Sequence, residues 1–275
     1  MSNDLKDVSR HFEFGENWQD YAASIDESHV GRAMESMQRL LSKDELAGKT
    51  FLEIGSGSGI HTLSALRLGA ASALATDIDP DSVRTTTTML QRFAGDGNWK
   101  SEQISVFDLQ TGGDPQSAGF DIVYSWGVLH HTGDMYKAID KALDQVGPGG
   151  LVCLALYRKT ALCWLWKLEK QFYTSAPEFM RKVLRGLFVA IFRAACLVKG
   201  VSFKKYVADY QSDRGMSYYH DIHDWMGGYP YESISPKSLT SYIEPKGYTL
   251  VRAITRPGGL GIFGAGCDEF VFRKT

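Results

Sequence analysis

The sequence predicts an α/β fold: a seven-stranded, mostly parallel sheet with helices on both faces, a helical N-terminal arm and a helical insertion after strand five. Two observations support this prediction. Short apolar runs alternate with helix-like segments between residues 49 and 157, which is typical of a parallel sheet with helical crossovers. Two further strand-like runs follow near the C-terminus, at residues 248–255 and 269–273.

The alternating region contains five expected strands and the helices that connect them. Helices are expected after the first strand, between Pro80 and Phe93, and between Asp134 and Val146. The threonines at 85–88 are poor helix formers, but Val83 and Leu90 still fit one helix face. The expected strands are residues 50–54, 72–76, 103–107, 120–125 and 151–157.

Two domains are expected. Residues 1–48 form a helical arm, because apolar residues recur at helical spacing from Gly31 to Leu41. Residues 49–275 form the sheet domain, which carries the helical insertion at about residues 160–230. The insertion is rich in aromatic and basic residues, and we interpret it as part of the sheet domain rather than as an independent unit.

Composition excludes several classes of protein. The chain has 275 residues, 44% of them hydrophobic, and a formal net charge of −2, so nothing in its overall charge favours a nucleic-acid partner. Its four cysteines are scattered, which argues against a zinc site and a disulfide framework and is consistent with a reducing cytoplasm. The N-terminus lacks the apolar core of a signal peptide, so we expect a cytoplasmic protein. Composition does not indicate the oligomeric state.

One apolar segment, residues 183–198, invites comparison with a membrane helix. It is shorter than the ~20 apolar residues that span a bilayer, and it contains Arg185 and Arg193. A buried or interfacial helix is therefore expected. Lysines that flank the segment leave a weak peripheral membrane contact open: Lys182, Lys199, Lys204 and Lys205.

The most informative motif follows the first strand, where Gly55, Gly57 and Gly59 are spaced two residues apart and Glu53 precedes them. Glycines allow the backbone to turn sharply and approach a ligand closely. A carboxylate at the strand end repels a pyrophosphate and attracts a cation. S-adenosylmethionine carries a sulfonium and an ammonium group and no phosphate, so the charges favour this cofactor over NAD.

The motif from Glu53 to Gly59 resembles the first motif of class I, Rossmann-like S-adenosylmethionine-dependent methyltransferases. The segment from Ser125 to His131 resembles the fourth motif of small-molecule methyltransferases such as the ubiquinone-biosynthesis type. The resemblance implies a sheet closed by one antiparallel strand, S-adenosyl-L-methionine as cofactor and a small-molecule acceptor. The N/D-P-P-Y/F motif is absent at strand four, which disfavours nucleic-acid and protein-glutamine substrates. Asn is expected where Asp268 stands.

The expected cofactor site lies beyond the carboxyl ends of the strands, where parallel α/β sheets bind ligands. Glu53 can polarise a water or the ammonium group, and Asp77 can accept both ribose hydroxyls. Ile78 and Phe107 can pack near the adenine, and Asp108 can accept from its amino group. The resemblance also implies that the arm, with Asn17, Trp18 and Tyr21, closes over the cofactor. The cofactor-binding candidates are Trp18, Glu53, Gly55, Ser56, Gly57, Gly59, Asp77, Ile78, Phe107, Asp108, Ser125 and Trp126.

Methyl transfer from a sulfonium mainly requires the alignment of acceptor, methyl and sulfur. A hydroxyl acceptor also benefits from a general base, for which histidine is suited near neutral pH. If residues 218–225 are helical, Tyr219 lies beside His223 and His220 lies beside Asp224. The catalytic candidates are therefore His131, His220, His223 and Tyr219. Metal chelation and a merely structural role are the alternatives for the histidines, and no metal is expected.

These observations predict a methyltransferase that modifies an oxygen or sulfur atom of a small molecule. A small-thiol S-methyltransferase is a narrower alternative, because a thiolate needs less help from a base. A protein that binds S-adenosylmethionine without catalysis is the second alternative. A nicotinamide dehydrogenase is disfavoured by the glycine spacing and by Glu53.

Overall fold

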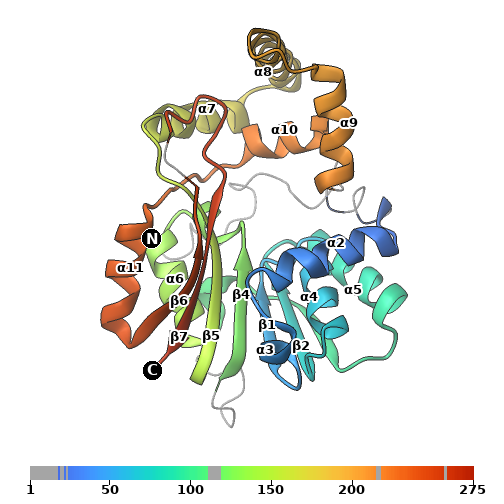
Figure 1. The fold of residues 1–275 in the computed structure, drawn as a ribbon, viewed down its shortest axis with the longest axis vertical. Coiled ribbons are helices and arrows are strands. Elements are labelled where there is room, and N and C mark those ends of the chain that lie inside the picture. Colours follow the sequence, from blue (N-terminus) through green and yellow to red (C-terminus); the bar gives the residue numbers. More distant parts are fainter. Residues whose placement is uncertain (1–17, 19–21, 23, 111–118, 215–217, 257–258) are drawn as a thin grey trace.

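The sheet has the predicted seven strands, in the order β3-β2-β1-β4-β5-β7-β6. A computed structural model describes residues 18, 22, 24–110, 119–214, 218–256 and 259–275 (Figure 1). β7 runs antiparallel to both of its neighbours, and the other strands are mutually parallel. The predicted fold is thus confirmed. The strands are β1 (Thr50–Ile54), β2 (Ser72–Asp77), β3 (Trp99–Gln103), β4 (Phe120–Trp126), β5 (Val146–Tyr157), β6 (Tyr248–Ile254) and β7 (Cys267–Lys274).

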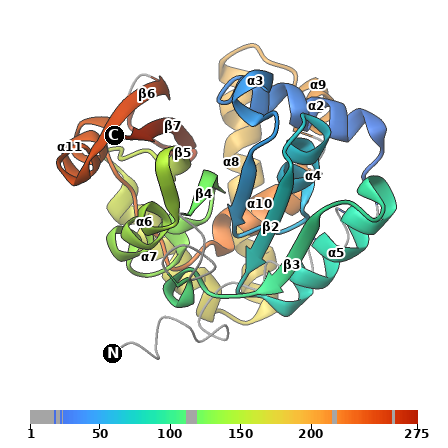
Figure 2. The same cartoon turned by 90° about the horizontal axis from the view of Figure 1, so that it is seen from below.

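Helices cover both faces of the sheet, and β1 shows how the sequence specifies this. Phe51 packs on one face with side chains of α2, α3 and α4, whereas its neighbour Leu52 packs on the other face with α6 and α11. Both residues are fully buried, as expected for a parallel strand. Figure 2 shows the two helical layers from below. One layer is α2 (Glu27–Gln38), α3 (Lys43–Leu46), α4 (Ile60–Arg67) and α5 (Pro80–Ala94), and the other contains α6 (Met135–Asp144) and α11 (Pro236–Ile243).

Two predicted strands, the third and the fifth, have wrong bounds. The third strand ends at Gln103, and Val106–Asp108 forms a short 3-10 helix, η3, because the Ser105 hydroxyl accepts a hydrogen bond from the Phe107 N–H. The fifth strand begins at Val146, not at residue 151, because Val146 pairs with Phe120 before an irregularity in the ladder.

The described part of the N-terminal arm packs against the sheet domain. α2 begins at Glu27, four residues earlier than its apolar pattern suggests, because the Asp26 side chain caps the N–H groups of Ser28 and His29. Met37 of α2 and Leu46 of α3 are fully buried in the same apolar cluster as Phe51. The boundary at residue 48 therefore crosses a continuous core, and the division into two domains stays a prediction.

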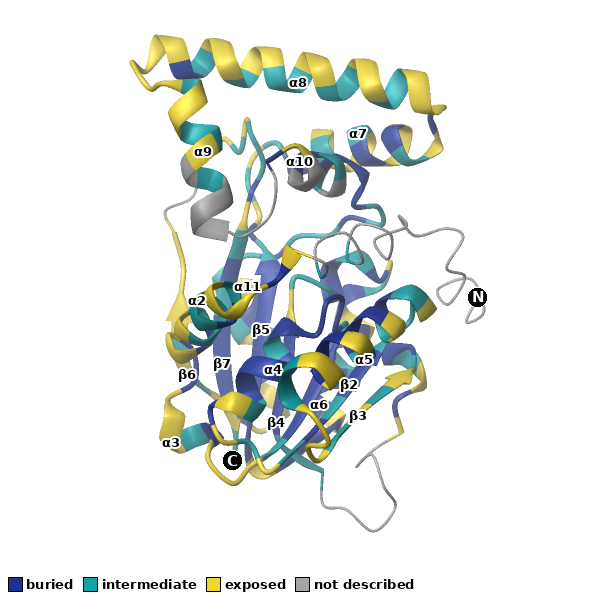
Figure 3. Ribbon diagram, turned by 90° about the vertical axis from the view of Figure 1, so that its right-hand side faces the viewer, coloured by how far each residue is buried: buried dark blue, intermediate teal, exposed yellow. Residues whose placement is uncertain are grey.

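The helical insertion, as we call residues 163–227, lies over the carboxyl ends of the strands (Figure 1). It consists of α7 (Cys163–Ser175), α8 (Glu178–Val198), α9 (Phe203–Arg214) and α10 (Tyr218–Gly227). It has an apolar cluster of its own, centred on buried Tyr173, Tyr218, Ile222 and Met226. Much of its outer surface is exposed (Figure 3). Among the described residues, no helix is long and apolar enough to cross a membrane. The cytoplasmic location stays a prediction.

Candidate functional site

The glycine loop follows β1 at the point where the strand order reverses between β1 and β4. All three glycines have positive φ, of 77° at Gly55, 52° at Gly57 and 78° at Gly59. Side chains from three other segments lie where Cβ atoms would be: Val128 at Gly55, Trp18 at Gly57 and Thr86 at Gly59. Both the backbone conformation and the packing therefore favour glycine at these three positions.

Two hydroxyl groups hold the loop in place. The Thr86 hydroxyl on α5 donates to the Gly57 carbonyl at 3.1 Å and lies 3.0 Å from the Ser56 hydroxyl. One member of the threonine run in α5, Thr86, thus fixes the glycine loop. Ser56 is buried, so its hydroxyl is engaged within the protein.

Glu53 lies beneath this loop and is 1% exposed. Its Oε2 accepts the backbone N–H of Thr62 at 3.0 Å and a short hydrogen bond from the Thr62 hydroxyl. The carboxylate therefore neutralises the positive N-terminal end of α4. Direct contact between Glu53 and an ammonium group stays a prediction, and in this geometry its two oxygens face α4.

His61 is a site residue that the sequence analysis missed. Its Nδ1 lies 3.3 Å from Glu53 Oε1, and its ring lies 5.2 Å from that of Tyr124 and 5.8 Å from that of Trp126. His61 thus links the first motif to the end of β4. Its position in the sequence, two residues after Gly59 and in the first turn of α4, could have indicated that it lies near the glycine loop.

Asp77 is the last residue of β2, as predicted for the acid that holds the ribose. Its carboxylate accepts the N–H of Gly57 at 2.9 Å and the N–H of Asp79 at 3.0 Å. Desolvation outweighs these donors and raises the pKa of Asp77 to about 6. A carboxylate joined to the glycine loop by a backbone hydrogen bond is well placed for a ligand in the loop.

The expected adenine side is formed by short segments after β2 and β3. Ile78 follows Asp77 and is half-buried, and its carbonyl accepts from Gln103 Nε2 at 3.1 Å. Phe107 in η3 is half-buried beneath Lys137, whose Nζ lies 5.2 Å from the ring centroid. Asp108 is exposed at the end of η3. The structure brings all three residues to the carboxyl edge, and their contacts with adenine stay predictions.

Ser125 and Trp126 end β4, and the structure gives them different roles. The Ser125 hydroxyl is buried and donates to the Ile54 carbonyl at 3.1 Å, so it joins β4 to β1. Trp126 is 40% exposed, and its indole N–H donates to Glu269 of β7 at 2.7 Å. Of these two residues, therefore, Trp126 exposes a surface that a ligand could contact, and Ser125 does not.

The two histidines after β4 differ in their tautomers. Buried His130 accepts the Tyr157 N–H at Nδ1, and burial holds its pKa well below the usual range. His131 Nδ1 lies 2.8 Å from the Pro230 carbonyl oxygen. Because a carbonyl only accepts, Nδ1 of His131 must carry the proton, and Nε2 is then the basic nitrogen of the neutral ring.

The candidates from the segment around residue 220 lie in α10, within the helical insertion. His223 Nδ1 lies 2.7 Å from the Tyr173 hydroxyl and 2.8 Å from Arg185, so it holds α10 against α7 and α8. Tyr219 is exposed and borders an open hollow of about 220 Å³ together with Arg185. The side chains of His220 and Asp224 lie outside the described residues, as do Asn17 and Tyr21.

Lys170, on α7 within the helical insertion, was also missed. It is fully buried, and its ammonium group lies 3.8 Å from the centroid of the Trp225 ring and donates to the Trp225 carbonyl. Burial lowers the pKa of Lys170 and raises that of its neighbour Glu169. Its helical position gave no sign that the side chain would be enclosed.

A buried ion pair lies at the start of β7. Arg158 donates through Nε at 2.8 Å and through a second nitrogen at 2.5 Å to Oδ1 of Asp268. Asp268 stands where an Asn is expected, and the buried guanidinium of Arg158 explains the acid. Since Arg158 follows β5 at the entrance to the insertion, the pair braces the junction between the two regions.

A comparison with protein families identifies the chain. A family model described as "Methyltransferase domain" matches residues 27–190, more than half of its length. The chain belongs to this family. The prediction of a class I S-adenosylmethionine-dependent methyltransferase is thereby confirmed, and the matched residues include every described candidate of the cofactor site from Glu53 to Trp126.

Solved structures of methyltransferases share this fold. The magnesium protoporphyrin IX methyltransferase of Synechocystis PCC 6803, with bound SAH, is 13% identical with a TM-score of 0.53, covering 90% of this chain and 84% of that one. A methyltransferase from Listeria monocytogenes, described as putative and S-adenosylmethionine-dependent, is 11% identical with a TM-score of 0.52, covering 89% and 99%. At these identities the similarity establishes the fold alone.

Curated relatives match only a short part of this methyltransferase. The ribosomal protein L11 methyltransferase of Serratia proteamaculans is 41% identical over 63 residues, which are 23% of this chain and 20% of the relative. That of Pectobacterium carotovorum is 31% identical over 111 residues, 39% and 35% of the two chains. The chain thus spans about a fifth to a third of the relatives' length.

The residues present fit S-adenosylmethionine. The Trp18 indole lies where a Gly57 Cβ would be, so an aromatic ring packs directly on the bare backbone of the glycine loop. Asp77 adds a carboxylate at that loop. Glu53 has already neutralised the adjacent helix end, so a sulfonium cofactor meets no concentrated positive charge there.

Proposed function

We propose that this methyltransferase transfers the methyl group of S-adenosylmethionine to an oxygen or sulfur atom of a small molecule. The observation that carries the proposal is the fixed tautomer of His131, in the turn after β4. Because Nδ1 donates to the Pro230 carbonyl, Nε2 is the basic nitrogen of the ring. A hydroxyl acceptor needs such a base and a thiol acceptor needs it less, so the role of His131 distinguishes the two.

We assign the cofactor to the carboxyl edge of β1 and β2. Asp77 would accept the ribose hydroxyls, the glycine loop would border the methionine part, and Trp18 would cover it. Ile78, Phe107 and Asp108 would surround the adenine, with Trp126 at the boundary with the acceptor. When bound, the cofactor supplies an electrophilic methyl group on a positively charged sulfur.

The chain's own part in the reaction is alignment and proton removal. His131 would take the proton of a hydroxyl acceptor at Nε2, while the Pro230 carbonyl stabilises the imidazolium that forms by accepting from Nδ1–H. His223, by contrast, is occupied by Tyr173 and Arg185, which favours a positioning role for it within the insertion. The helical insertion would exclude water from above the site.

The test is turnover of a panel of phenols, sugars, small thiols and ribosomal protein L11 with labelled S-adenosylmethionine. For a hydroxyl acceptor, His131→Asn should lower kcat by about 10²–10⁴-fold while the Kd of the cofactor stays unchanged. His29→Asn, on α2, is the matched control and should retain full activity.

Three results would count against the proposal. No binding of S-adenosylmethionine at millimolar concentration would refute the cofactor assignment. Binding without turnover of any acceptor would favour a non-catalytic binding protein. A thiol acceptor whose turnover rises with pH and survives His131→Asn would select the S-methyltransferase alternative and remove the base from the mechanism.

A further inference from the structure

Helix α8 has two apolar sides, an inner and an outer one. Its inner side contributes Leu184, Phe188 and Phe192 to the apolar cluster of the helical insertion. Its outer side bears exposed apolar side chains that the other described residues leave uncovered, between 51% and 88% exposed. These are Phe179, Val183, Leu187, Ile191, Leu197 and Val198.

The spacing of these residues places them together on one side of the helix. At ~100° per residue, positions 179, 183, 187, 191, 197 and 198 fall within less than half of the circumference. Small residues, Gly186, Ala190 and Ala194, share this arc and are also exposed. Figure 3 shows α8 along its length at the end of the molecule farthest from the sheet. We call this arc the outer face of α8.

A continuous row of this kind differs from the isolated apolar residues found on most protein surfaces. An apolar helix side of this length is normally covered by other residues, and among the described residues only the inner side of α8 is covered. The preceding helix α7 adds further exposed apolar side chains: Trp164, Leu165, Leu168 and Phe172. Such a surface indicates a binding partner with an apolar interior.

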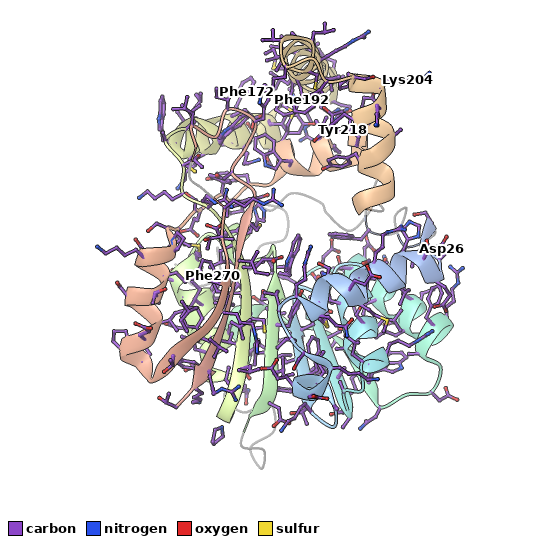
Figure 4. All side chains as sticks on the ribbon, viewed as in Figure 1. Asp26, Phe172, Phe192, Lys204, Tyr218 and Phe270 are labelled. Carbon is purple, nitrogen blue, oxygen red and sulfur yellow. The ribbon has the colours of Figure 1, made fainter. Side chains whose placement is uncertain are left out.

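The charge around the outer face indicates which partner. Residues 176–208 contain seven basic side chains and one acidic side chain, Glu178, whereas the whole chain has a net charge of −2. Glu178 is itself paired with Arg185 at 2.8 Å. Lys182 and Arg193 border the outer face along one edge and are exposed. Lys199 caps the end of α8, and Lys204 and Lys205 lie in the first turn of α9 (Figure 4 labels Lys204); all three are exposed.

We propose that the outer face of α8 docks on the surface of an anionic lipid bilayer. The aliphatic and aromatic side chains would enter the headgroup–acyl boundary, and the lysines would contact lipid phosphates, as in interfacial amphipathic helices. A second copy of this chain fits less well, because two such basic surfaces would repel each other. A nucleic acid would leave the aliphatic row exposed to water.

The test is co-sedimentation of the full chain with two kinds of vesicle, phosphatidylcholine alone and phosphatidylcholine mixed with phosphatidylglycerol. The protein should bind the mixed vesicles more tightly, and added salt should weaken the binding. The double variant Leu187→Glu/Ile191→Glu should lower the partition coefficient by about a hundredfold or more. Lys204→Glu/Lys205→Glu should lower it by about 25-fold or more.

The matched control is Val251→Glu, at an exposed apolar position on β6, which should bind vesicles like the unaltered chain. Unchanged thermal midpoints and unchanged binding of S-adenosylmethionine would show that the variants are folded. Equal binding to both vesicles, or no binding by the folded unaltered chain, would overturn the proposal. So would a stable dimer that Leu187→Glu/Ile191→Glu dissociates, since it would assign the outer face to a second copy.

Discussion

The sheet and the helical insertion differ in how completely they bury their apolar side chains. In the sheet, Phe51 and Leu52 bury successive side chains on opposite faces, and helices cover both. In the insertion, α8 buries Phe188 and Phe192 but leaves Leu187 and Ile191 in solvent. Apolar residues on both faces of β1 are therefore core residues, whereas on α8 the side of the helix decides whether an apolar residue is buried or exposed.

The junction between the two regions should give the largest effect. Asp268→Ala would leave the Arg158 guanidinium buried without its partner, and we expect the free energy of unfolding to fall by about 3–5 kcal/mol. Asp268→Asn keeps an acceptor oxygen and should cost less. Urea denaturation of the three proteins would measure this. Equal stability of Asp268→Ala and the unaltered chain would mean that the pair does not brace the junction.

A matched pair of leucines tests the comparison itself. Leu52→Ala, fully buried in β1, should lower the free energy of unfolding by about 2–5 kcal/mol. Leu187→Ala, on the outer face of α8, should change it by less than about 0.5 kcal/mol. Chemical denaturation of both variants measures the difference. A large loss for Leu187→Ala would show that the outer face is covered in solution.

Asp77 should make cofactor binding depend on pH. Its pKa of about 6 means that the ligand-free protein protonates it as the pH falls below 6, whereas ribose hydroxyls require the ionised form. Affinity for S-adenosylmethionine should therefore be constant above about pH 7 and fall as the pH drops through 6. Asp77→Ala should weaken binding more than about tenfold at neutral pH, and Asp77→Asn should abolish the pH dependence. Calorimetry across this pH range would show both effects.

The same pKa has a consequence for stability that has the opposite sign. The pKa is raised above its unfolded value, so the folded protein holds this proton more tightly. The contribution of Asp77 to stability is therefore present below about pH 4 and is lost as the pH rises to about 6. If Asp77→Asn left the pH dependence of the ligand-free protein's thermal midpoint unaltered in this window, Asp77 would not be the group responsible.

The smallest expected effect concerns the glycine loop. Gly57→Ala places a methyl group 2.9 Å from the Trp18 ring at a left-handed φ, which should cost about 1 kcal/mol. Gly186→Ala is the matched control, since its Cβ would meet nothing within 4 Å and the residue lies in the middle of α8. Denaturation should show a loss for the first variant and a small gain for the second.

The strands were predictable where local pattern alone decides them. Alternation of short apolar runs with helices located β1, β2 and β4 to within a residue or two. The third strand was misplaced because Val106 and Phe107 look like strand residues, while the Ser105 side chain turns the backbone into a 3-10 helix. A side-chain hydrogen bond of this kind overrides propensity and leaves little trace in an apolar pattern.

The candidate site was predictable in its positions but not in its bonding. The acid at the end of β2 and the histidine after β4 lie where parallel strands must bring them. That Ser125 would bond to Ile54, or that His223 would contact Tyr173 fifty residues away, depends on tertiary packing. Lys170 was missed for the same reason, because its partner Trp225 is distant in the sequence.

The hydrogen bond from Thr62 to Glu53 has a consequence for ligand choice. In many nucleotide sites the first turn of the helix after the glycine loop is an open anion receptor. Here a carboxylate of the protein's own β1 already fills that receptor from within the core. We therefore expect a phosphate group, and with it a dinucleotide, to be disfavoured at this helix end.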